Sequence, residues 1–195
     1  MHRYYYRIIV SNEPLSVFEK DRAWHLLEQL NIPAMQEACK FLVGHHDFSS
    51  FRASGCQAKS PIKTLDELHV RETPCWMSSC LQPLQKECDK ENVREAADVM
   101  VQSLEKGTCR KDDHATANPP KELSKPHCYV ITARARSFLY HQVRLMVGLL
   151  KAVGTGDLQV RDVSQILEAR TVTKAPPMAP ACGLYLGDVK YEFET

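Results

Sequence analysis

The stretch S-F-L-Y-H-Q-V-R-L-M-V-G-L-L-K-A-V-G, residues 137–154, decides the fold that we expect. We predict one helix over this range, because Ser137 suits the N-cap and Gly154 suits the left-handed position after the last turn. Apolar residues at helical spacing occupy both sides: Leu139, Val143, Met146, Leu150 and Val153 on one, and Phe138, Leu145 and Leu149 on the other. A helix that is apolar all round is buried, so we expect the other elements to pack around it.

Arg144 interrupts this apolar pattern, with Tyr140 and His141 one turn before it. A buried guanidinium is costly unless it meets an anion or a hydrogen-bond acceptor. Two interpretations stay open at this point. Arg144 either forms a local ion pair or reaches solvent at the edge of the helix packing, or it binds an anionic group that matters for function.

Alternating apolar residues predict strands elsewhere, and helical spacing predicts two further helices. The predicted strands span 2–10, 61–70, 127–136 and 183–193, the further helices span 31–43 and 160–170, 17–27 is irregular or strand, and 171–181 is an extended linker. Residues 45–51 are interpreted as a turn in which Asp47 is a cap and Phe48 and Phe51 enter the core. The sum is an α+β fold, an antiparallel or mixed sheet with helices on one face.

Residues 71–126 differ in character from the rest of the chain. They are rich in Lys, Glu, Asp, Ser and Pro, and only 92–104 has the spacing of a short amphipathic helix. A loop of this length is uncommon inside a compact domain. We therefore predict a variable, partly disordered insertion between two strands of a hairpin, within a single domain that spans residues 1–195.

The overall composition is that of an ordinary globular protein, with 44% hydrophobic and 25% charged residues and a net charge of +1. This charge by itself indicates neither a nucleic acid nor a membrane surface as partner. No apolar run approaches the twenty or so residues that span a membrane, so we expect no membrane association. The eight cysteines are scattered, which favours thiols in a reducing intracellular compartment, either the mitochondrion or the cytoplasm.

The common catalytic and metal-binding motifs do not occur in this sequence. Cys75, Cys80 and Cys88 lack the C-x-x-C spacing of zinc sites, so we predict no metal. A nucleophile elbow and the glycine-rich phosphate loops do not occur either. His45 and His46 beside Asp47 could supply acid–base groups, but the capping interpretation of Asp47 is favoured.

Tyr4 belongs to three consecutive tyrosines in the predicted strand 2–10, where Tyr4 and Tyr6 share one face and Tyr5 takes the other. On sequence alone, packing of these rings on the sheet is favoured. The functional alternative is a face on which a nucleobase stacks, worth about 1–3 kcal/mol for each base.

Six motifs together resemble the C-terminal domain of TruA-type tRNA pseudouridine synthases. They are R-Y-Y-Y-R-I at 3–8, L-V-G-H-H-D-F-S-S-F-R at 42–52, S-P-I-K-T at 60–64, F-L-Y-H-Q-V-R-L-M-V-G at 138–148, I-L-E-A-R at 166–170 and A-P-A-C-G-L-Y-L-G-D-V-K-Y at 179–191. The resemblance covers nearly all of the chain outside 71–126. Within the family, the chain is similar in character to the eukaryotic pseudouridine-synthase-like proteins.

This resemblance implies one ferredoxin-like half of the pseudouridine synthase fold, a mixed sheet shared by two such halves with an RNA cleft between them, and a homodimer. It implies that the substrate is RNA, with tRNA expected, and that uridine is isomerised to pseudouridine. An aspartate nucleophile cleaves the N-glycosidic bond, and the flipped-out base turns over and re-attaches through C5. The family uses no cofactor and no metal.

The resemblance also implies roles for individual residues. Tyr4 resembles the tyrosine that stacks on the target uracil and takes part in proton removal. Arg144 resembles the arginine that pairs with the nucleophilic aspartate. Leu184 and Leu186 would form the apolar floor of the uracil site, and three cations, Lys59, Lys63 and Arg134, would contact RNA phosphates.

The sequence departs from the family in one respect. The family's nucleophile lies in a G-R-T-D motif before the strand that matches 2–10, and no R-T-D occurs among the 195 residues. We expect an N-terminally truncated form that is inactive alone, and neither Asp47 nor Asp188 is assigned the nucleophile's role. The alternatives are a non-catalytic RNA-binding or dimerising remnant and an isoform that folds poorly because its sheet edges are exposed.

Overall fold

The computed structural model describes residues 1–74 and 125–190. Within these ranges it contains six strands, three α-helices and three short 3-10 turns. The strands are β1 (His2–Val10), β2 (Trp24–Leu26), β3 (Gly44–Asp47), β4 (Ile62–Thr73), β5 (His127–Ala135) and β6 (Leu184–Val189). The helices are α1 (Ile32–Leu42), α4 (Gln142–Gly154) and α5 (Asp162–Ala169), and the 3-10 turns are Ser49–Phe51, Val172–Lys174 and Ala181–Gly183.

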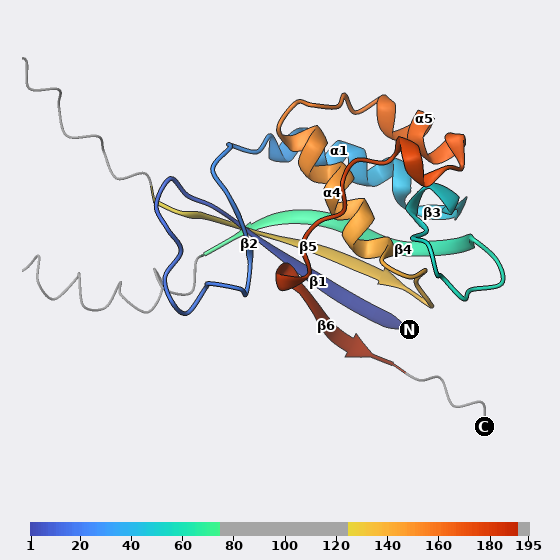
Figure 1. Cartoon of the computed structure of the whole chain (residues 1–195), viewed down its shortest axis with the longest axis horizontal. Coiled ribbons are helices and arrows are strands. Elements are labelled where there is room, and N and C mark those ends of the chain that lie inside the picture. The colour runs from blue at the N-terminus through green and yellow to red at the C-terminus, as the bar shows by residue number, and fades with distance from the viewer. Residues whose placement is uncertain (75–124, 191–195) are drawn as a thin grey trace, which may run out of the picture. The chain divides into compact units, whose positions relative to one another are not determined.

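The strands form one mixed sheet in the order β2-β1-β5-β4-β3, and β6 also pairs with β1. β2 and β6 share the outer side of β1. β2 runs parallel to the last residues of β1, Ile8 to Val10. β6 runs antiparallel to the first residues of β1, with Tyr4 opposite Leu186. The remaining pairs are antiparallel. Figure 1 shows β6 lying beside the N-terminal end of β1.

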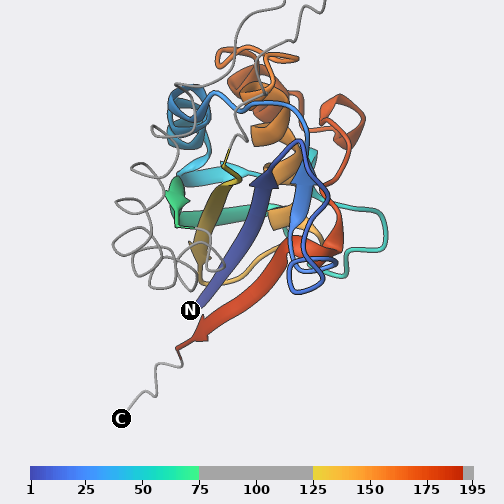
Figure 2. The same ribbon diagram turned by 90° about the vertical axis from the view of Figure 1, so that its left-hand side faces the viewer.

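The three α-helices cover one face of this sheet, as both views show (Figures 1 and 2). Side chains of that face and of the helices form a single core, in which Tyr6, Ile8, Met146 and Leu149 are fully buried. The predicted α+β class with helices on one face is therefore confirmed. No helix in the described part of the chain is long and apolar enough to cross a membrane.

Helix α1 begins where the sequence predicts. The side chain of Asn31 accepts a hydrogen bond from the Ala34 amide at 3.1 Å, and Pro33 occupies the first turn, where its missing N–H costs nothing. The core side is made by four residues spaced at three and four: Met35, Ala38, Cys39 and Leu42. The predicted helix is confirmed.

Helix α4 begins later than predicted. Ser137 is not its N-cap: the helix starts at Gln142, after His141, whose φ of 60° is left-handed. Gln142 explains this start. Its side-chain Oε1 accepts a hydrogen bond from the Leu139 amide at 2.8 Å, and its backbone amide donates to the Leu139 carbonyl at 3.1 Å. These bonds close a turn, and the residues from Ser137 to His141 are left outside the helix.

The end of α4 also differs from the prediction. Gly154 is the last helical residue and not a left-handed one; Thr155 follows as C-cap, and the positive φ belongs to Gly156. A Cβ on Gly154 would lie 2.7 Å from the Met35 sulfur, so close packing against α1 accounts for this glycine. As predicted for a helix that is apolar all round, α4 is buried throughout except at Arg144 and Lys151.

Another glycine of α4 allows a second segment to cross the helix. A Cβ on Gly148 would lie 2.1 Å from the carbonyl oxygen of Pro177, so only glycine permits this approach. We call residues 175–183 the strap. Ala179 of the strap is fully buried, and the Tyr6 hydroxyl donates to the Pro180 carbonyl at 2.6 Å. The predicted extended linker over 171–181 is correct for most of its length but contains the 3-10 turn at Val172–Lys174.

The segment around His45 is partly a strand, which the sequence analysis did not predict. Gly44 to Asp47 pair with Leu65 to Ile62 of β4, so β3 forms the edge of the sheet. The capping prediction is confirmed: Asp47 Oδ1 accepts hydrogen bonds from the amide and the hydroxyl of Ser49. Phe48 and Phe51 are both fully buried, as expected.

Strands β4 and β5 pair antiparallel from Leu65 opposite Ala135 to Thr73 opposite Cys128. Residues 74–126 separate these two strands in the sequence, which agrees with the prediction of an interrupted hairpin. The predicted start of the insertion at Arg71 is wrong, because Arg71 to Thr73 belong to β4. The amphipathic helix predicted at 92–104 lies outside the described residues, and the single-domain boundaries stay a prediction. The predicted helix at 160–170 is confirmed as α5, with Val163, Ile166 and Leu167 buried.

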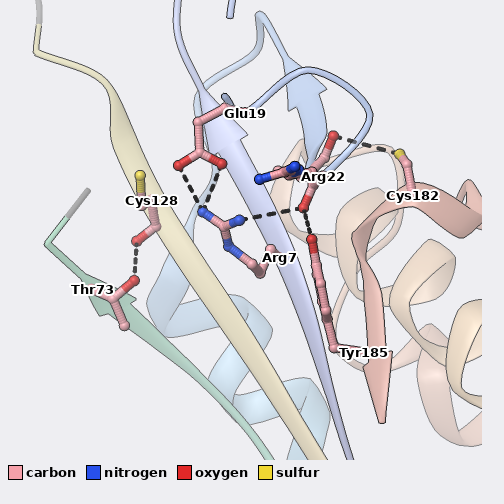
Figure 3. A network of polar contacts seen from close by, with 8 residues as sticks. Arg7, Glu19, Arg22, Thr73, Cys128, Cys182 and Tyr185 are labelled. Carbon is pink, nitrogen blue, oxygen red and sulfur yellow. Dashed lines mark hydrogen bonds and ion pairs between the residues drawn. The ribbon is translucent and has the colours of Figure 1, made fainter. Parts of the chain in front are cut away.

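A polar cluster fixes the connection between β1 and β2 (Figure 3). The Arg7 guanidinium lies 2.8 Å from the carboxylate of Glu19, whose exposed fraction is only 2%. The Tyr185 hydroxyl of β6 donates to the Arg22 carbonyl at 2.6 Å, and the Cys182 thiol contacts the Ala23 carbonyl. Residues 19–23 are therefore attached both to β1 and to β6.

Candidate functional site

A pocket of about 520 Å³ opens where the first residues of β1, the turn before α4 and the start of β6 meet. We call it the Arg144 pocket. Its lining comes from four places in the chain: His2 and Tyr4; Cys56, Gln57 and Ala58; the residues from Ser137 to Arg144; and Leu184. The pairing of β1 with β6 is what brings residues so distant in sequence to one place.

Arg144 lies in the first turn of α4 and is half-buried. Its Nε donates to the carbonyl of Ala179 at 2.8 Å, and the Ala179 amide donates back to the Arg144 carbonyl at 3.1 Å. No carboxylate in the described residues pairs with it, so the local-ion-pair interpretation is wrong for this part of the chain. The strap thus holds one side of the guanidinium and leaves the rest of it for another acceptor.

Tyr4 forms an aromatic wall of the same pocket. Its ring meets Phe138 edge to face, with centroids 5.3 Å apart and an interplanar angle of 86°. Leu184 lines the same pocket. A half-buried tyrosine supported by an edge-on phenylalanine offers a flat apolar surface, which suits the face of a planar ring.

The turn before α4 adds two further rings. Tyr140 and His141 stack with centroids 3.8 Å apart and an interplanar angle of 25°. The turn is fixed to the segment 52–58, because the Tyr140 carbonyl accepts from the Ala53 amide and the Tyr140 amide donates to the sulfur of Cys56 at 3.3 Å. Sequence analysis missed these residues as pocket residues, since it placed them inside a helix.

The amide of Tyr140 has an electrostatic consequence for Cys56. Hydrogen bonds from the backbone amides of Tyr140 and Ala58 favour the thiolate and lower the pKa of Cys56, and the nearby guanidinium of Arg52 acts in the same direction. Arg52 is itself held by the carbonyls of Cys56 and Ala58, at 3.0 and 2.7 Å. The pocket therefore contains a thiol with raised thiolate character.

The other residues that the resemblance singled out lie outside the Arg144 pocket. Leu186 is 55% exposed on β6 and does not line it. Lys59 is exposed in the loop before β4, and Lys63 lines a neighbouring pocket. Arg134 lies on β5, and its guanidinium pairs with Glu67 at 3.0 Å. The structure thus brings together Tyr4, Arg144 and Leu184, but not these four.

No carboxylate from the described residues lines the Arg144 pocket. Asp47 is engaged with Ser49, whose hydroxyl lowers the pKa of Asp47, and it also pairs with Arg170. Asp188 pairs with Arg3 at 3.3 Å. Across residues 1–74 and 125–190, no group of histidine, cysteine and acidic side chains could hold a metal ion.

Comparison with known proteins gives a consistent result. The sequence pattern of the family described as tRNA pseudouridine synthase matches residues 38–192. Proteins named tRNA pseudouridine synthase A are 39% identical over 96% of this chain in Paramagnetospirillum magneticum and 40% identical over 96% of it in Rhodospirillum centenum. A protein of that name from Xanthobacter autotrophicus is 36% identical over 97%.

The match covers 53%, 55% and 56% of these three relatives, so the chain spans about half of their length. The family pattern nevertheless covers most of the chain, including all of α4, which contains Arg144. On these grounds the chain belongs to the tRNA pseudouridine synthase family.

Proposed function

We propose that this chain forms the uracil-binding side of a tRNA pseudouridine synthase active site. The observation that carries the proposal is the convergence of Tyr4, Arg144 and Leu184 on one pocket, which the described residues leave without a carboxylate. An arginine that is only partly satisfied, beside an aromatic ring, suits a site that receives a carboxylate and a pyrimidine together.

In the proposed reaction, an aspartate that reaches the pocket attacks the target nucleotide and the N-glycosidic bond breaks. The freed uracil turns over and forms a bond through C5, and the proton on C5 is lost. The chemistry uses no cofactor or metal. Arg144 would hold the aspartate ionised and oriented, because a neighbouring cation lowers the pKa of a carboxyl group and fixes its geometry.

Tyr4 is proposed to stack on the uracil as it turns over and to take part in removing the C5 proton. Phe138 contacts the Tyr4 ring edge-on, which keeps that ring in one orientation. Leu184 would contact the apolar part of the base. Leu186 is proposed for the same apolar surface. Because Leu186 lies outside the pocket, this role requires RNA or protein that extends beyond the pocket to reach it.

RNA binding is proposed to involve Lys59, Lys63 and Arg134. The first two are available to phosphate, whereas a phosphate at Arg134 would compete with Glu67. tRNA is the proposed RNA, since the relatives are named for it. A homodimer is also proposed, and light scattering of the purified chain would measure its mass in solution.

The activity test uses two proteins. The 195-residue chain alone is expected to release no tritium from tRNA labelled at uridine C5. A fusion of this chain behind the segment of the P. magneticum relative that carries the family's G-R-T-D motif is expected to release it. Tritium release by the chain alone would refute the assignment of the nucleophile to a residue that it lacks.

Substitutions in the active fusion test the roles of the pocket residues. Arg144→Met is expected to lower kcat at least about a hundredfold, because a misoriented nucleophile loses most of its effect. Arg71→Gln is the matched control, since Arg71 is exposed on β4 and lines neither this pocket nor its neighbour. Equal activity of Arg144→Met and the unsubstituted fusion would refute the proposal.

The alternative function, a non-catalytic RNA-binding or dimerising protein, gives a different pattern. The fusion would then be inactive while the chain alone still bound tRNA in a gel shift that weakens with salt, or formed a stable dimer.

A further inference from the structure

A second pocket lies next to the Arg144 pocket. Its volume is about 590 Å³, and we call it the Lys63 pocket. It is lined by Met1, His45, Ile62, Lys63, Thr64, Asp66, Arg136, Ser137 and Lys190. Ser137 lines both pockets, and His2 of the first is the chain neighbour of Met1 in the second.

Strand pairing explains why these residues meet. Ala135 at the end of β5 is opposite both His2 at the start of β1 and Leu65 near the start of β4. His2 is in turn opposite Val189 at the end of β6. Arg136, Lys190 and Lys63 therefore gather at one end of the sheet, where Figure 1 shows the N-terminal end of β1 beside the arrowheads of β5 and β6.

The charges of the Lys63 pocket are unusual for this molecule. Lys63, Arg136 and Lys190 supply three cations, against the single carboxylate of Asp66. In residues 1–74 and 125–190, no ion pair or side-chain hydrogen bond engages any of these three cations. Three other arginines of the sheet are paired with carboxylates: Arg134 with Glu67, Arg7 with Glu19 and Arg3 with Asp188.

Uncompensated cations beside hydroxyl groups are the chemistry that binds phosphodiesters. Lys and Arg contact phosphate oxygens directly, and a hydroxyl donor such as that of Ser137 adds a neutral hydrogen bond. A nucleotide whose base enters the Arg144 pocket is covalently joined to a phosphate on either side. Because Ser137 belongs to both pockets, the Lys63 pocket is where we expect a phosphate next to such a base.

We propose that the Lys63 pocket binds the RNA phosphate next to the target uridine, with Arg136 and Lys190 as its principal contacts. The proposal rests on the proposed function in one respect, namely that a base occupies the Arg144 pocket. It adds to that function two residues, Arg136 and Lys190, to which the resemblance gave no role. It also gives the RNA strand a path along the surface, from the Arg144 pocket to the Lys63 pocket at the end of the sheet.

Binding of a labelled single-stranded RNA nonamer with one central uridine tests the site. Fluorescence anisotropy would measure its affinity for the 195-residue chain between about 50 and 200 mM salt, where phosphate contacts are strongly salt-dependent. Arg136→Gln and Lys190→Gln are each expected to weaken binding about fivefold and to reduce the salt slope by about 0.7. The matched controls are Arg71→Gln and Lys174→Gln, which remove exposed cations outside both pockets.

Folding does not confuse this comparison, because Arg136 and Lys190 are exposed and their substitution should leave the melting temperature unchanged. Losses no larger than those of the two controls would overturn the proposal. The proposal would also fail if the unsubstituted chain bound the nonamer no better than its Arg136→Gln variant.

A chemical substitution in the RNA locates the phosphate. Replacing the phosphate on either side of the central uridine by a neutral methylphosphonate is expected to weaken binding at one of the two positions. At that position Arg136→Gln should add no further loss. Losses that multiply at both positions would show that Arg136 does not contact a phosphate next to the uridine.

The outcome is independent of catalysis. Binding that depends on Arg136 in a protein whose fusion forms no pseudouridine would support the phosphate site and refute the proposed activity. The opposite result is an active fusion in which Arg136→Gln and Lys190→Gln change neither tritium release nor RNA affinity. That result would support the proposed activity and refute the phosphate site.

Discussion

Arg7 and Arg144 are both partly buried arginines, but the groups that the chain places against their guanidinium groups differ. Around Arg7 the chain supplies a buried carboxylate, Glu19, at 2.8 Å (Figure 3). Around Arg144 the described residues supply only the carbonyl of Ala179. A charge with an internal counter-ion serves the fold, whereas one held by a neutral acceptor remains available to a ligand.

The largest expected effect is a difference in cysteine reactivity, which reports whether reagents can enter the Arg144 pocket. Cys56 lines its pocket and has a lowered pKa, first because the Tyr140 amide donates to its sulfur. Cys39 lies on the buried face of α1, and burial raises the pKa of its thiol to about 12. A lowered pKa means more thiolate at neutral pH and a raised one means less, so iodoacetamide should alkylate Cys56 at least about a thousandfold faster than Cys39.

Peptide mass spectrometry of the native protein at about pH 7 would measure both rates. After unfolding in urea the two cysteines should react at similar rates, which is the internal control. Comparable rates in the folded protein would mean that the pocket is closed and that the contrast between the two regions is wrong.

The next effect compares the two arginines directly. Arg7→Met leaves Glu19 buried without a cation and is expected to lower the free energy of unfolding by about 3 kcal/mol. Arg144→Met leaves only the Ala179 carbonyl unpaired and should cost about 1 kcal/mol. Urea denaturation followed by circular dichroism gives both values.

A second substitution refines this comparison. Adding Glu19→Met to Arg7→Met removes the isolated carboxylate, so the double variant should be more stable than Arg7→Met alone. Equal costs for Arg7→Met and Arg144→Met would show that the two sites are alike and would remove the reason to regard Arg144 as available.

The strap that holds Arg144 gives a smaller effect. Gly148→Ala places a methyl group against the backbone carbonyl of Pro177, and we expect a loss of about 2 kcal/mol in the free energy of unfolding, because this backbone has to move. Gly154→Ala is the matched control. Its methyl group meets side-chain atoms of Met35 and Leu30, which shift more easily than a backbone carbonyl, and the higher helix propensity of alanine, about 1 kcal/mol, offsets part of the cost. Similar losses for both variants would contradict the described path of the strap.

The smallest expected effect is a pH dependence at Asp47. The Ser49 hydroxyl, followed by the Ser49 amide and Arg170, lowers the pKa of Asp47 in the folded chain. A lowered folded-state pKa contributes stability above the unfolded-state pKa, and that contribution is lost as the pH falls through the folded-state pKa. Ser49→Ala should therefore flatten the decline in stability between about pH 5 and pH 3. Ser60→Ala is the control, and an identical decline in both variants would contradict the assignment.

The sequence predicted most of the scaffold, because strong local patterns coincide with burial. Strand β1 was predicted with its observed bounds, and α1 to within a residue, since Asn31 and Pro33 are clear start signals. The start of α4 was not predicted. Ser137 is a good cap by type, but the competing turn depends on a hydrogen bond from the Leu139 amide to the Gln142 side chain, and glutamine has no strong local signature.

Strand β3 was missed for a similar reason. Gly44 to Asp47 contain no β-branched residue, and the segment is extended because it pairs with β4, a tertiary effect that propensity does not report. At the site, the pattern indicated that Arg144 needs a partner. Only the family resemblance predicted that Tyr4 and Arg144 share a site. Local sequence patterns could not, because the pairing of β1 with β5 and β6 is what brings residues 4 and 144 together. Nothing local pointed to Cys56.

The pairing of β1 with β6 also determines when the pocket can exist during synthesis. Tyr4 leaves the ribosome long before Leu186, its partner across the two strands. Throughout that interval one edge of β1 has no β6 beside it, and Arg144 lacks the strap that fixes its guanidinium. An unpaired strand edge on a nascent chain invites association with other chains. Demand for chaperones should accordingly be greatest just before the strap and β6 emerge, and binding competence should arrive in one late step.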